Sequence, residues 1–556
     1  MDADSEVTLL HRQLSTTFKG VKHPFSSSDF PIAQFRGIKY GTISARFKQA
    51  SLFDRYPEYS NTTAHGPACP QTPRSTSLEE ALNGLSLNQI QATGVKGKGN
   101  VDEFECLNLV ITVPQMAMGN SGLPVLIYFH GGGNYSGSNS SWFNDGANLV
   151  QQSMKIQKPI VFVGINYRLA AFGFLASQAL RDDNGGTGGG NYGARDQHLA
   201  IEWVYRYITE FGGDPQNITI SGESAGALGV QSQIHSLFPS HFSRAILQSS
   251  SLSSPALHYP QSLEEKNEIY AKLLAALHVN TVDELRKVPW IDLLNAYEIC
   301  NGRNGLPELL LVDDEFISAS WQKSFSFPSW NGKEVLIGDT ANEGDVFRLL
   351  AMSVPDSKQP FDPEKLVLDI CRDLSERQAA DITHVYDILP SKSNTEIYNT
   401  VLELWEDLAF YHSTSSFVTS VKDNLGKAYR YVFEQLNPFS GGLFYGSSNH
   451  SLDLIYLFGS ENTFRDLKSH EIENAMREKL QDRWIAFVYG LEPWPQSSVY
   501  EFGPGGATRQ LSEKEFRSKR RVQHHEVLDT LEPRDHRHLF GISTSFLIQH
   551  SQYAKK

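Results

Sequence analysis

Residues 218–230 read ITISGESAGALGV, the most informative stretch of the chain. An apolar, β-branched run is followed at once by small and helix-forming residues, which predicts a strand that turns sharply into a helix. Gly222 and Gly226 flank Ser224 at this turn. A tight turn that needs only small residues would give the same pattern. The pattern G-x-S-x-G is also typical of a nucleophile elbow, in which a strained bend exposes the serine oxygen.

Several other short runs are apolar nearly throughout, as expected of strands that are covered on both faces of a sheet. The predicted strands are 124–129, 159–166, 218–222, 244–249, 334–339 and 428–434. Helical periodicity between and beyond them predicts helices over 196–211, 224–237 and 471–489. Strands that alternate with helices predict an α/β fold with a large, mostly parallel central sheet.

The composition is that of a globular protein with ample material for a large core. The 556 residues are 40% hydrophobic, and 49 basic against 63 acidic residues give a net charge of −14. This acidic balance argues against nucleic acid as a partner, because phosphate contacts need a basic face. We find no signal-peptide pattern and no apolar run of about 18 residues, so we expect a cytoplasmic protein without a membrane span. The oligomeric state is not indicated.

Two further stretches raise other possibilities. Gly188, Gly190 and Gly193 match the G-x-G-x-x-G pattern of nucleotide-binding loops, but that pattern requires a strand directly before it. Loop-like sequence separates it from the nearest predicted strand, so we expect a surface loop. The mixed charges of residues 513–526, EKEFRSKRRVQHHE, predict a solvated face rather than a nucleic-acid patch.

A second glycine cluster, HGGG at residues 130–133, follows the predicted strand 124–129. A tight turn is again the simple explanation. The alternative is an oxyanion hole, because acyl transfer from Ser224 would build negative charge on a carbonyl oxygen. Backbone N–H groups aimed at that oxygen are worth about 3–4 kcal/mol each. A strand followed by HGGG, upstream of G-x-S-x-G, favours the oxyanion hole.

With these motifs the chain resembles the type-B carboxylesterases, the carboxylesterase/cholinesterase group of α/β-hydrolases. The matching stretches are FECLNLVI (104–111), YFHGGG (128–133), INYRLAAFGFL (165–175), GNYGARDQHLAIEWV (190–204), FGGDPQNITISGESAG (211–226), AILQS (245–249), NEG (342–344) and HSLDLIYLFG (450–459). The resemblance implies a single α/β-hydrolase domain over residues 1–556, with helices on both faces of the sheet. The tails at 1–35 and 500–556 match poorly.

The resemblance also implies the partners that a serine nucleophile needs, a base and a carboxylate that orients the base. His450 is at the family's H-x-x-[DE]-L-x-[YF]-x-F-G pattern, whereas periodicity selects none of the 18 histidines. Glu343 is at the family's glutamate position, shortly after a predicted strand. Asp339 and Asp345 are its competitors, with Asp345 a distant second. Asp453 is expected to support the loop of His450 rather than to join the triad.

These residues imply a serine esterase that hydrolyses small-molecule carboxylic esters through an acyl-enzyme on Ser224. The N–H groups of Gly132, Gly133 and Ala225 would bind the oxyanion. No metal or organic cofactor is implied, and the sequence contains no H-E-x-x-H motif or comparable ligand cluster.

Two other functions are weighed against this one. An acyltransferase, lactonase or thioesterase-like step in intracellular metabolism would use the same chemistry. A non-catalytic binding module of the cholinesterase type is disfavoured, because Ser224, Glu343 and His450 are all present. Segments 254–328 and 352–420 are expected to cap the pocket. Asn134 stands where many relatives carry an aromatic residue near the acyl pocket, so the acyl preference is open.

The four cysteines divide into two pairs. Cys69 and Cys106 occupy positions that resemble the first disulfide of the family, although a cytoplasmic location argues against the bond. We expect the bond if the protein meets oxidising conditions. Cys300 and Cys371 are expected to be unpaired thiols.

Overall fold

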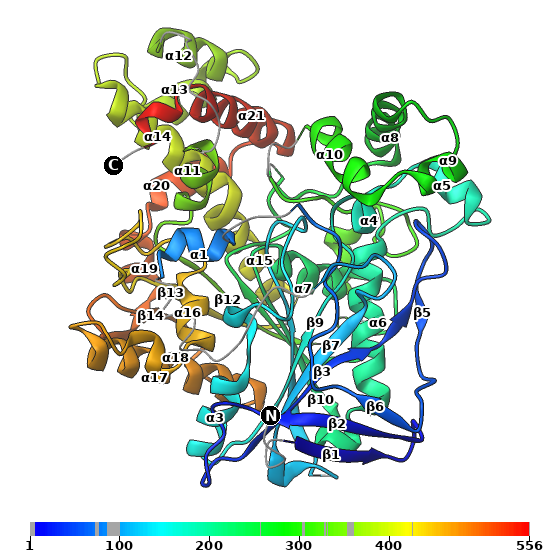
Figure 1. The fold of residues 1–556 in the computed structure, drawn as a ribbon. Helices are drawn as coiled ribbons and strands as arrows, with labels where there is room; N and C mark the ends of the chain where they lie inside the picture. The colour runs from blue at the N-terminus through cyan, green and yellow to red at the C-terminus, as the bar shows by residue number, and fades with distance from the viewer. Residues whose placement is uncertain are drawn as a thin grey trace.

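The structure is a computed structural model of the chain. It describes residues 6–72, 77–85, 100–119, 121–255, 257–302, 306–326, 330, 332–352, 361–424 and 426–554. Within these residues thirteen strands form one large sheet, which runs through the middle of the molecule (Figure 1). Its strands are β1 (Glu6–His11), β2 (Thr16–Lys22), β3 (Ile32–Lys39), β6 (Tyr59–Asn61), β7 (Asn108–Pro114), β8 (Leu123–Phe129), β9 (Val161–Ile165), β10 (Gly213–Glu223), β11 (Arg244–Gln248), β12 (Glu334–Thr340), β13 (Lys427–Phe433), β14 (Ser498–Phe502) and β15 (Thr508–Ser512).

The centre of the sheet is parallel and its edges are antiparallel. The order is β1-β2-β3-β7-β9-β8-β10-β11-β12-β13-β14-β15, with β6 beside β2. All neighbours from β9 to β14 pair in parallel. The pairs β1–β2, β2–β3, β3–β7, β7–β9 and β14–β15 are antiparallel. β4 (Gly41–Thr42) and β5 (Ser51–Leu52) form a separate small pair.

Helices cover both faces of the parallel centre, which gives the sheet two hydrophobic cores. The first core contains α6 (Tyr192–Tyr207) and α7 (Ala225–His235). The second contains α3 (Ala147–Lys155), α16 (Leu452–Phe458) and α18 (His470–Val488). Figure 1 shows α6 on one side of the sheet and α16 with α18 on the other.

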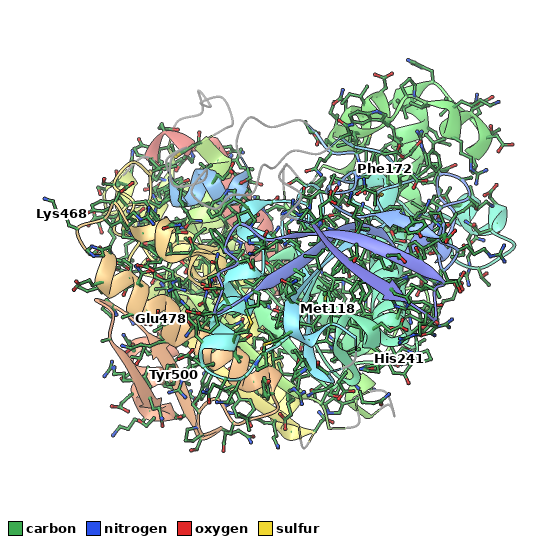
Figure 2. All side chains as sticks on the ribbon, turned by 60° about the horizontal axis from the view of Figure 1, so that its bottom comes forward. Met118, Phe172, His241, Lys468, Glu478 and Tyr500 are labelled. Atoms are coloured by element: carbon green, nitrogen blue, oxygen red, sulfur yellow. The ribbon has the colours of Figure 1, made fainter. Side chains whose placement is uncertain are left out.

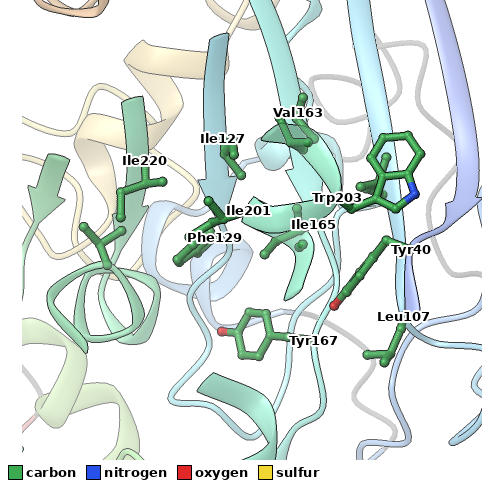
Figure 3. Close-up of a cluster of buried hydrophobic side chains, with 14 of the residues drawn as sticks. Tyr40, Leu107, Ile127, Phe129, Val163, Ile165, Tyr167, Ile201, Trp203 and Ile220 are labelled. Atoms are coloured by element: carbon green, nitrogen blue, oxygen red, sulfur yellow. The ribbon is translucent and has the colours of Figure 1, made fainter. Parts of the chain in front are cut away.

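Successive residues of β8 alternate between these two cores. Ile127 and Phe129 pack in the first core with Trp203 of α6, as Figure 3 shows. Leu126 and Tyr128 belong to the second core. Because side chains alternate along a strand and both faces are buried here, every position of the strand is apolar. The prediction of an α/β fold with helices on both faces is confirmed.

Two groups of helices stand on opposite sides at the top of the molecule as drawn in Figure 1. One group is α8 (Leu263–Leu277), α9 (Val282–Lys287) and α10 (Trp290–Asn301). The other has its own hydrophobic core and contains α11 (Asp345–Met352), α12 (Pro363–Cys371), α13 (Glu376–Val385), α14 (Asn394–Glu406) and α21 (Pro533–Gln549). They include parts of the predicted capping segments, of which residues 256, 303–305, 327–328 and 353–360 lie outside the described residues.

The remaining helices are short, apart from α15, which packs against β12 and β13. They are α1 (Leu78–Asn83), α4 (Ala170–Phe174), α5 (Gln178–Asp183), α15 (His412–Asp423), α17 (Glu461–Phe464), α19 (Glu513–Lys519) and α20 (Val522–Leu528). Within the described ranges, we find no helix with the length and apolar character that a bilayer crossing requires.

Each predicted strand is present, and the bounds differ most at β10, which begins at Gly213 instead of residue 218. The expectation of a solvated face over residues 513–526 is wrong in part. Phe516 and Arg520 are buried, because α19 packs against β14 and β15, and α20 packs against α13 and residues Asp407–Tyr411. Exposed charges of the expected kind lie elsewhere, for example at Lys468 and Glu478 (Figure 2).

Candidate active site

Ser224 lies at the turn from β10 into α7, in a backbone conformation that few non-glycine residues adopt. Its φ is 54° and its ψ is −124°. Its N–H donates to the carbonyl oxygen of Gln248 at 2.9 Å, which ties the turn to the neighbouring strand β11. A strained residue held by its surroundings at the end of a central strand points to a functional role.

The two glycines around Ser224 have a packing reason. A Cβ at Gly226 would lie 2.1 Å from the carbonyl oxygen of Phe129, at the end of β8. A Cβ at Gly222 would lie 2.4 Å from the backbone of Gly226. Both glycines therefore let α7 start directly against β8 and β10, and this close approach holds the elbow in place.

The glycine loop after β8 lies against the elbow. A Cβ at Gly131 would lie 2.7 Å from Glu223 Oε2 and 3.3 Å from the Cβ of Ser224. Gly132 and Gly133 have φ values of 98° and 66°, which a side chain would disfavour. Among the described residues, no acceptor is hydrogen-bonded to the N–H of Gly132, Gly133 or Ala225. These three donors are thus available to a ligand oxygen.

Glu343 and His450 come from the loops that follow two adjacent parallel strands, β12 and β13. A β-bridge between Asn342 and Asn449 joins these loops one residue before each side chain. The N–H of Asn342 donates to the carbonyl oxygen of Ser448 at 2.9 Å. The bridge brings Nδ1 of His450 into a short hydrogen bond with Glu343 Oε2.

The other aspartates that the sequence offered have different partners. Asp339 lies beside Arg520 and Arg430, with N···O distances of 3.2 and 3.7 Å. Asp345 accepts a hydrogen bond from Ser447 Oγ at 2.5 Å. The structure therefore pairs His450 with Glu343 and with neither competitor.

Asp453 stabilises the residues around the His450 loop and does not pair with His450, as expected. Its Oδ2 accepts hydrogen bonds of 2.8 Å from Gln248 Nε2 and from the Tyr431 hydroxyl. These bonds join α16 to β11 and β13, the strands on either side of β12.

Burial and charge set the ionisation of the pair. Burial disfavours the charge of Glu343, but the attraction of His450 and hydrogen bonds from His450 and the Thr340 N–H outweigh it and lower the pKa of Glu343. Burial likewise disfavours the imidazolium of His450, yet the charges of Glu343 and Glu223 raise its pKa to about 9. Glu343 thus favours a proton on the ring.

Glu223 is a neighbour of His450 that the sequence analysis did not assign to the site. Its Oε1 lies 3.2 Å from Nε2 of His450 and accepts a hydrogen bond from Ser451 Oγ at 2.6 Å. The side chain is fully buried, and burial raises its pKa to about 8 in spite of the nearby imidazole. The only sequence signal was its position directly before Ser224.

A small cavity lies beside the elbow and the glycine loop. Its volume is about 10 Å³. The lining residues are Asn134, Phe174, Ala194, Gln197, Leu228, Gly229, Leu252, His258, Glu308 and Leu310. Glu308 is fixed to the glycine loop, because its N–H donates to the carbonyl oxygen of Gly133 at 3.0 Å. The sequence indicated Asn134 at this place but not Glu308.

Cys69 and Cys106 are both buried and carry free thiols in this structure. A hydrogen bond between the two side chains, together with burial, raises the pKa of Cys106. Sγ of Cys69 accepts a hydrogen bond from the Leu169 N–H at 3.2 Å. The two cysteines are neighbours, and the disulfide between them stays a prediction.

Comparisons with known proteins agree with this fold and site. The carboxylesterase family model matches residues 8–521. Lipase 3 of Yarrowia lipolytica (strain CLIB 122 / E 150) is 27% identical over 515 residues, which cover 90% of this chain and 93% of the lipase. Para-nitrobenzyl esterase of Bacillus subtilis (strain 168) is 25% identical over 507 residues, covering 88% and 93% of the two chains.

A solved structure supports the fold independently. A PNB esterase structure matches with a TM-score of 0.72 and 22% identity, over 93% of this chain and 99% of that chain. The family model covers most of the chain, including the elbow, the glycine loop and the loops of Glu343 and His450. The chain therefore belongs to the carboxylesterase family and is a carboxylic ester hydrolase.

Proposed function

We propose that the chain hydrolyses small-molecule esters through an acyl-enzyme on Ser224, with His450 as the base and Glu343 as the acid that orients it. The observation that carries this proposal is the buried Glu343–His450 pair, which is held by bridged loops and contacts Glu223, the residue before the strained Ser224. A serine hydroxyl is a weak nucleophile, so a base with its own orienting carboxylate is the required support.

The reaction takes two half-reactions. The proton of Ser224 Oγ passes to Nε2 of His450 while Oγ attacks the ester carbonyl carbon. The tetrahedral intermediate carries its charge on the former carbonyl oxygen, where the N–H groups of Gly132, Gly133 and Ala225 bind it. The C–O bond to the alcohol then breaks, and the alcohol leaves with the proton from His450. Water repeats these steps on the acyl-enzyme and restores the serine.

Proton transfer requires Nε2 of His450 within about 3 Å of Ser224 Oγ. In this structure Nε2 lies 3.2 Å from Glu223 Oε1. Catalytic hydrogen bonds are often formed fully only in the substrate complex. We therefore expect Nε2 to exchange Glu223 for Ser224 when an ester binds.

The small cavity beside the elbow supports a preference for short acyl groups. Its volume is about 10 Å³, and Leu228 and Leu252 are among the side chains that leave it nearly filled. Asn134 adds a polar group there. A space of this size holds about one water-sized group, so an ester with a long acyl chain would have to displace these buried side chains, whereas an acetyl group would displace them least.

A panel of p-nitrophenyl esters with graded acyl length tests the proposal. The wild type should release nitrophenol, fastest from the short esters. Ser224→Ala should lose activity by on the order of 10⁴-fold or more, because the nucleophile is gone. The exposed Ser391→Ala is a matched control that should leave the rate unchanged.

Labelling with a fluorophosphonate gives a second measurement. The wild type should acquire one label, and a peptide map should place it on Ser224. A label on another serine, or ester hydrolysis that persists in Ser224→Ala, would contradict the assignment. A wild type that neither hydrolyses esters nor takes the label would instead indicate a binding protein.

A further inference from the structure

The end of α14 contacts both members of the Glu343–His450 pair. Oε1 of Glu406, the last residue of α14, accepts a hydrogen bond of 3.0 Å from the Glu343 N–H. The chain continues as a π-helical turn over Asp407–Tyr411, and the Phe410 ring of this turn lies 5.4 Å from the His450 ring between centroids. π-Helical turns are rare and occur frequently at functional sites. This turn thus brings two side chains of one segment against the two members of the pair.

Glu343 lies on a short loop that is held from two sides. The loop runs from the end of β12 at Thr340 to the start of α11 at Asp345. The β-bridge to the His450 loop holds it on one side. Glu406 holds it on the other side, and its Oε2 lies so close to Gly344 that an added Cβ there would be only 3.2 Å away. The direction of the Glu343 side chain therefore depends on both anchors.

Glu406 is itself held in place by burial and by an arginine. The residue is 7% exposed. Nη2 of Arg521, which directly precedes α20, lies 4.0 Å from Glu406 Oε1 and 3.0 Å from Asp407 Oδ1. The same guanidinium forms an ion pair through Nη1 with Glu403, one turn earlier on α14. Arg521 thus fixes the end of α14 and limits the movement of Glu406.

The environment of Glu406 favours its neutral form near neutral pH. Burial raises the pKa of Glu406 to about 8, although the positive charge of Arg521 opposes this increase. A neutral carboxyl still accepts a hydrogen bond through an oxygen. It can therefore hold the Glu343 N–H without placing a second negative charge beside the Glu343 carboxylate.

We propose that Glu406 is a positioning residue for ester hydrolysis, which holds the main chain of Glu343 and so keeps its carboxylate at Nδ1 of His450. This inference rests on the proposed function, because it concerns the same pair. Without Glu406 Oε1, the buried Glu343 N–H would lose its acceptor, and a buried donor without an acceptor is unfavourable. The loop would move to find another acceptor, and the carboxylate would move with it.

Two substitutions separate the acceptor from the bulk of the side chain. Glu406→Leu removes the acceptor at similar size, whereas Glu406→Gln keeps an amide oxygen in the position of Oε1 and is neutral. With p-nitrophenyl acetate, Glu406→Leu should lower kcat by about 10–100-fold, because a small misplacement of the pair is costly. The KM should stay the same, since Glu406 acts through Glu343. Glu406→Gln should keep most of the wild-type kcat.

The pKa of His450 gives a direct measurement that needs no ester. It is read by NMR titration of the full chain labelled with ¹⁵N-histidine, and the His450 signal is identified by its loss in His450→Gln. The charges of Glu343 and Glu223 raise this pKa to about 9. In Glu406→Leu it should fall by about one pH unit, because a carboxylate within reach raises it by about 1–3 pH units and a displaced one raises it less. In Glu406→Gln it should stay near the wild-type value.

Glu403→Leu is the matched control on the same helix. It removes an ion pair with the same Arg521, but among the described residues Glu403 forms no hydrogen bond with the Glu343 loop. Its kcat and its His450 pKa should equal those of the wild type. Urea unfolding shows whether each variant is folded. If Glu406→Leu does not fold, Glu406→Ala, which leaves room for water, replaces it.

Three results would overturn the proposal. A Glu406→Leu variant that loses stability but keeps the wild-type kcat and His450 pKa would show that Glu406 is only structural. A Glu406→Gln variant that is as impaired as Glu406→Leu would show that an acceptor oxygen is not what matters. A Glu403→Leu variant with the same shift in the His450 pKa would attribute the effect to Arg521.

The two readouts also keep this inference apart from the proposed function. A wild type that does not hydrolyse esters, but whose His450 pKa falls in Glu406→Leu and not in Glu406→Gln, would refute the esterase proposal and support the positioning role. A wild type that hydrolyses esters, with the same kcat and His450 pKa in Glu406→Leu, would do the reverse.

Discussion

Two buried carboxylates contact opposite nitrogens of the His450 ring. Glu343 binds Nδ1, and Glu223 lies 3.2 Å from Nε2. Glu343 therefore fixes the orientation of the ring. Glu223 contacts Nε2, the nitrogen that must accept the proton of Ser224 during catalysis. The ionisation of one residue, His450, consequently depends on charges at two others.

The first prediction concerns the pH dependence of activity. Glu343 and Glu223 raise the pKa of His450 to about 9, and only the neutral ring can accept the serine proton. The value of kcat/KM should therefore rise with pH along a limb that lies well above the ordinary imidazole value of about 6.5. Initial rates with p-nitrophenyl acetate over pH 5–10, corrected for spontaneous hydrolysis, measure this limb.

Two variants distinguish the effects of the two carboxylates on the pH profile of kcat/KM. Glu223→Gln removes one negative charge, so the limb should shift to lower pH. Glu343→Gln should lose most of kcat, by about 10³–10⁴-fold, because the ring loses its orienting acid. The exposed Glu364→Gln on α12 is the control. A limb near pH 6.5 in the wild type would show that the carboxylates do not control His450.

At the scale of elements, the strand–turn–helix unit of β10 and α7 is the critical part. Its geometry depends on close backbone contact: the Cα of Gly226 approaches the end of β8 so nearly that no side chain fits. The elbow, the glycine loop and α7 are therefore one packed unit, and a change at the glycine alters the position of Ser224.

The second prediction tests this contact with a pair of glycines. Gly226→Ala would place Cβ 2.1 Å from the Phe129 carbonyl oxygen, so the free energy of unfolding should fall by roughly 1–3 kcal/mol and activity should fall with it. Gly541→Ala in α21 meets open space and should raise the stability by up to about 1 kcal/mol. Urea unfolding of both variants decides the question. Equal effects would mean that the elbow is not close-packed.

The third prediction concerns the loop closed by Cys69 and Cys106. The two thiols are hydrogen-bonded neighbours, so mild oxidation should join them while Cys300 and Cys371 keep reacting with an alkylating reagent. A disulfide that closes a loop of this length should raise the free energy of unfolding by roughly 3–4 kcal/mol. Peptide mapping identifies the bond, and Cys106→Ser is the control. Thiols at both positions after oxidation would refute the pairing.

At the scale of the whole molecule, the two ends of the chain form opposite edges of one sheet. β1 to β3 make one edge, and β14 with β15 make the other. Beyond β15, Arg520 reaches back to the central strands: its Nη1 lies 3.5 Å from the Thr340 carbonyl oxygen, and its Nη2 lies 3.2 Å from Asp339. The C-terminal region therefore neutralises a carboxylate in the middle of the sheet.

The fourth prediction tests that neutralisation. Arg520→Leu should lower the free energy of unfolding by about 3–5 kcal/mol at pH 8, because Asp339 is then buried with only the more distant Arg430 beside it. Burial already raises the pKa of Asp339 to about 6. Without Arg520 this pKa rises further, so at pH 5 the carboxyl is protonated and the loss of stability should be smaller.

A double-variant cycle controls for lost packing. Asp339→Asn combined with Arg520→Leu removes both charges and should recover much of the stability that Arg520→Leu loses. Urea unfolding at pH 5 and pH 8 supplies the values. A loss in Arg520→Leu that is equal at both pH values, and that Asp339→Asn does not reduce, would mean that Arg520 acts only through its bulk.

The sequence predicted the centre of this molecule because the centre is simple. Strands that are buried on both faces, such as β8 and β9, are apolar at every position, and that pattern is visible without a structure. β1 was missed, although its buried Val7 and Leu9 alternate with exposed residues. Six residues of alternation at the start of a chain are a weak signal for an edge strand.

The candidate site was predictable where a motif carries it, at Ser224, Glu343 and His450. Glu223 was not, because its role depends on the direction of the His450 ring. The positions of Arg430 and Arg520 beside Asp339 were not predictable either. Arg430 is one polar position in a predicted strand, and Arg520 sits in a mixed-charge run. The packing of α19 against β14 and β15 brings the two guanidiniums together.

The contact between Asp339 and Arg520 has a consequence for protein synthesis. The ribosome releases β12 long before it releases Arg520, so a nascent chain must hold Asp339 without its main counter-ion. The central strands that carry the elbow and the Glu343–His450 loops can form at that stage, but the sheet stays electrostatically incomplete. A chain that ends before Arg520 lacks this counter-ion, so we expect its central strands to be less stable than those of the full chain.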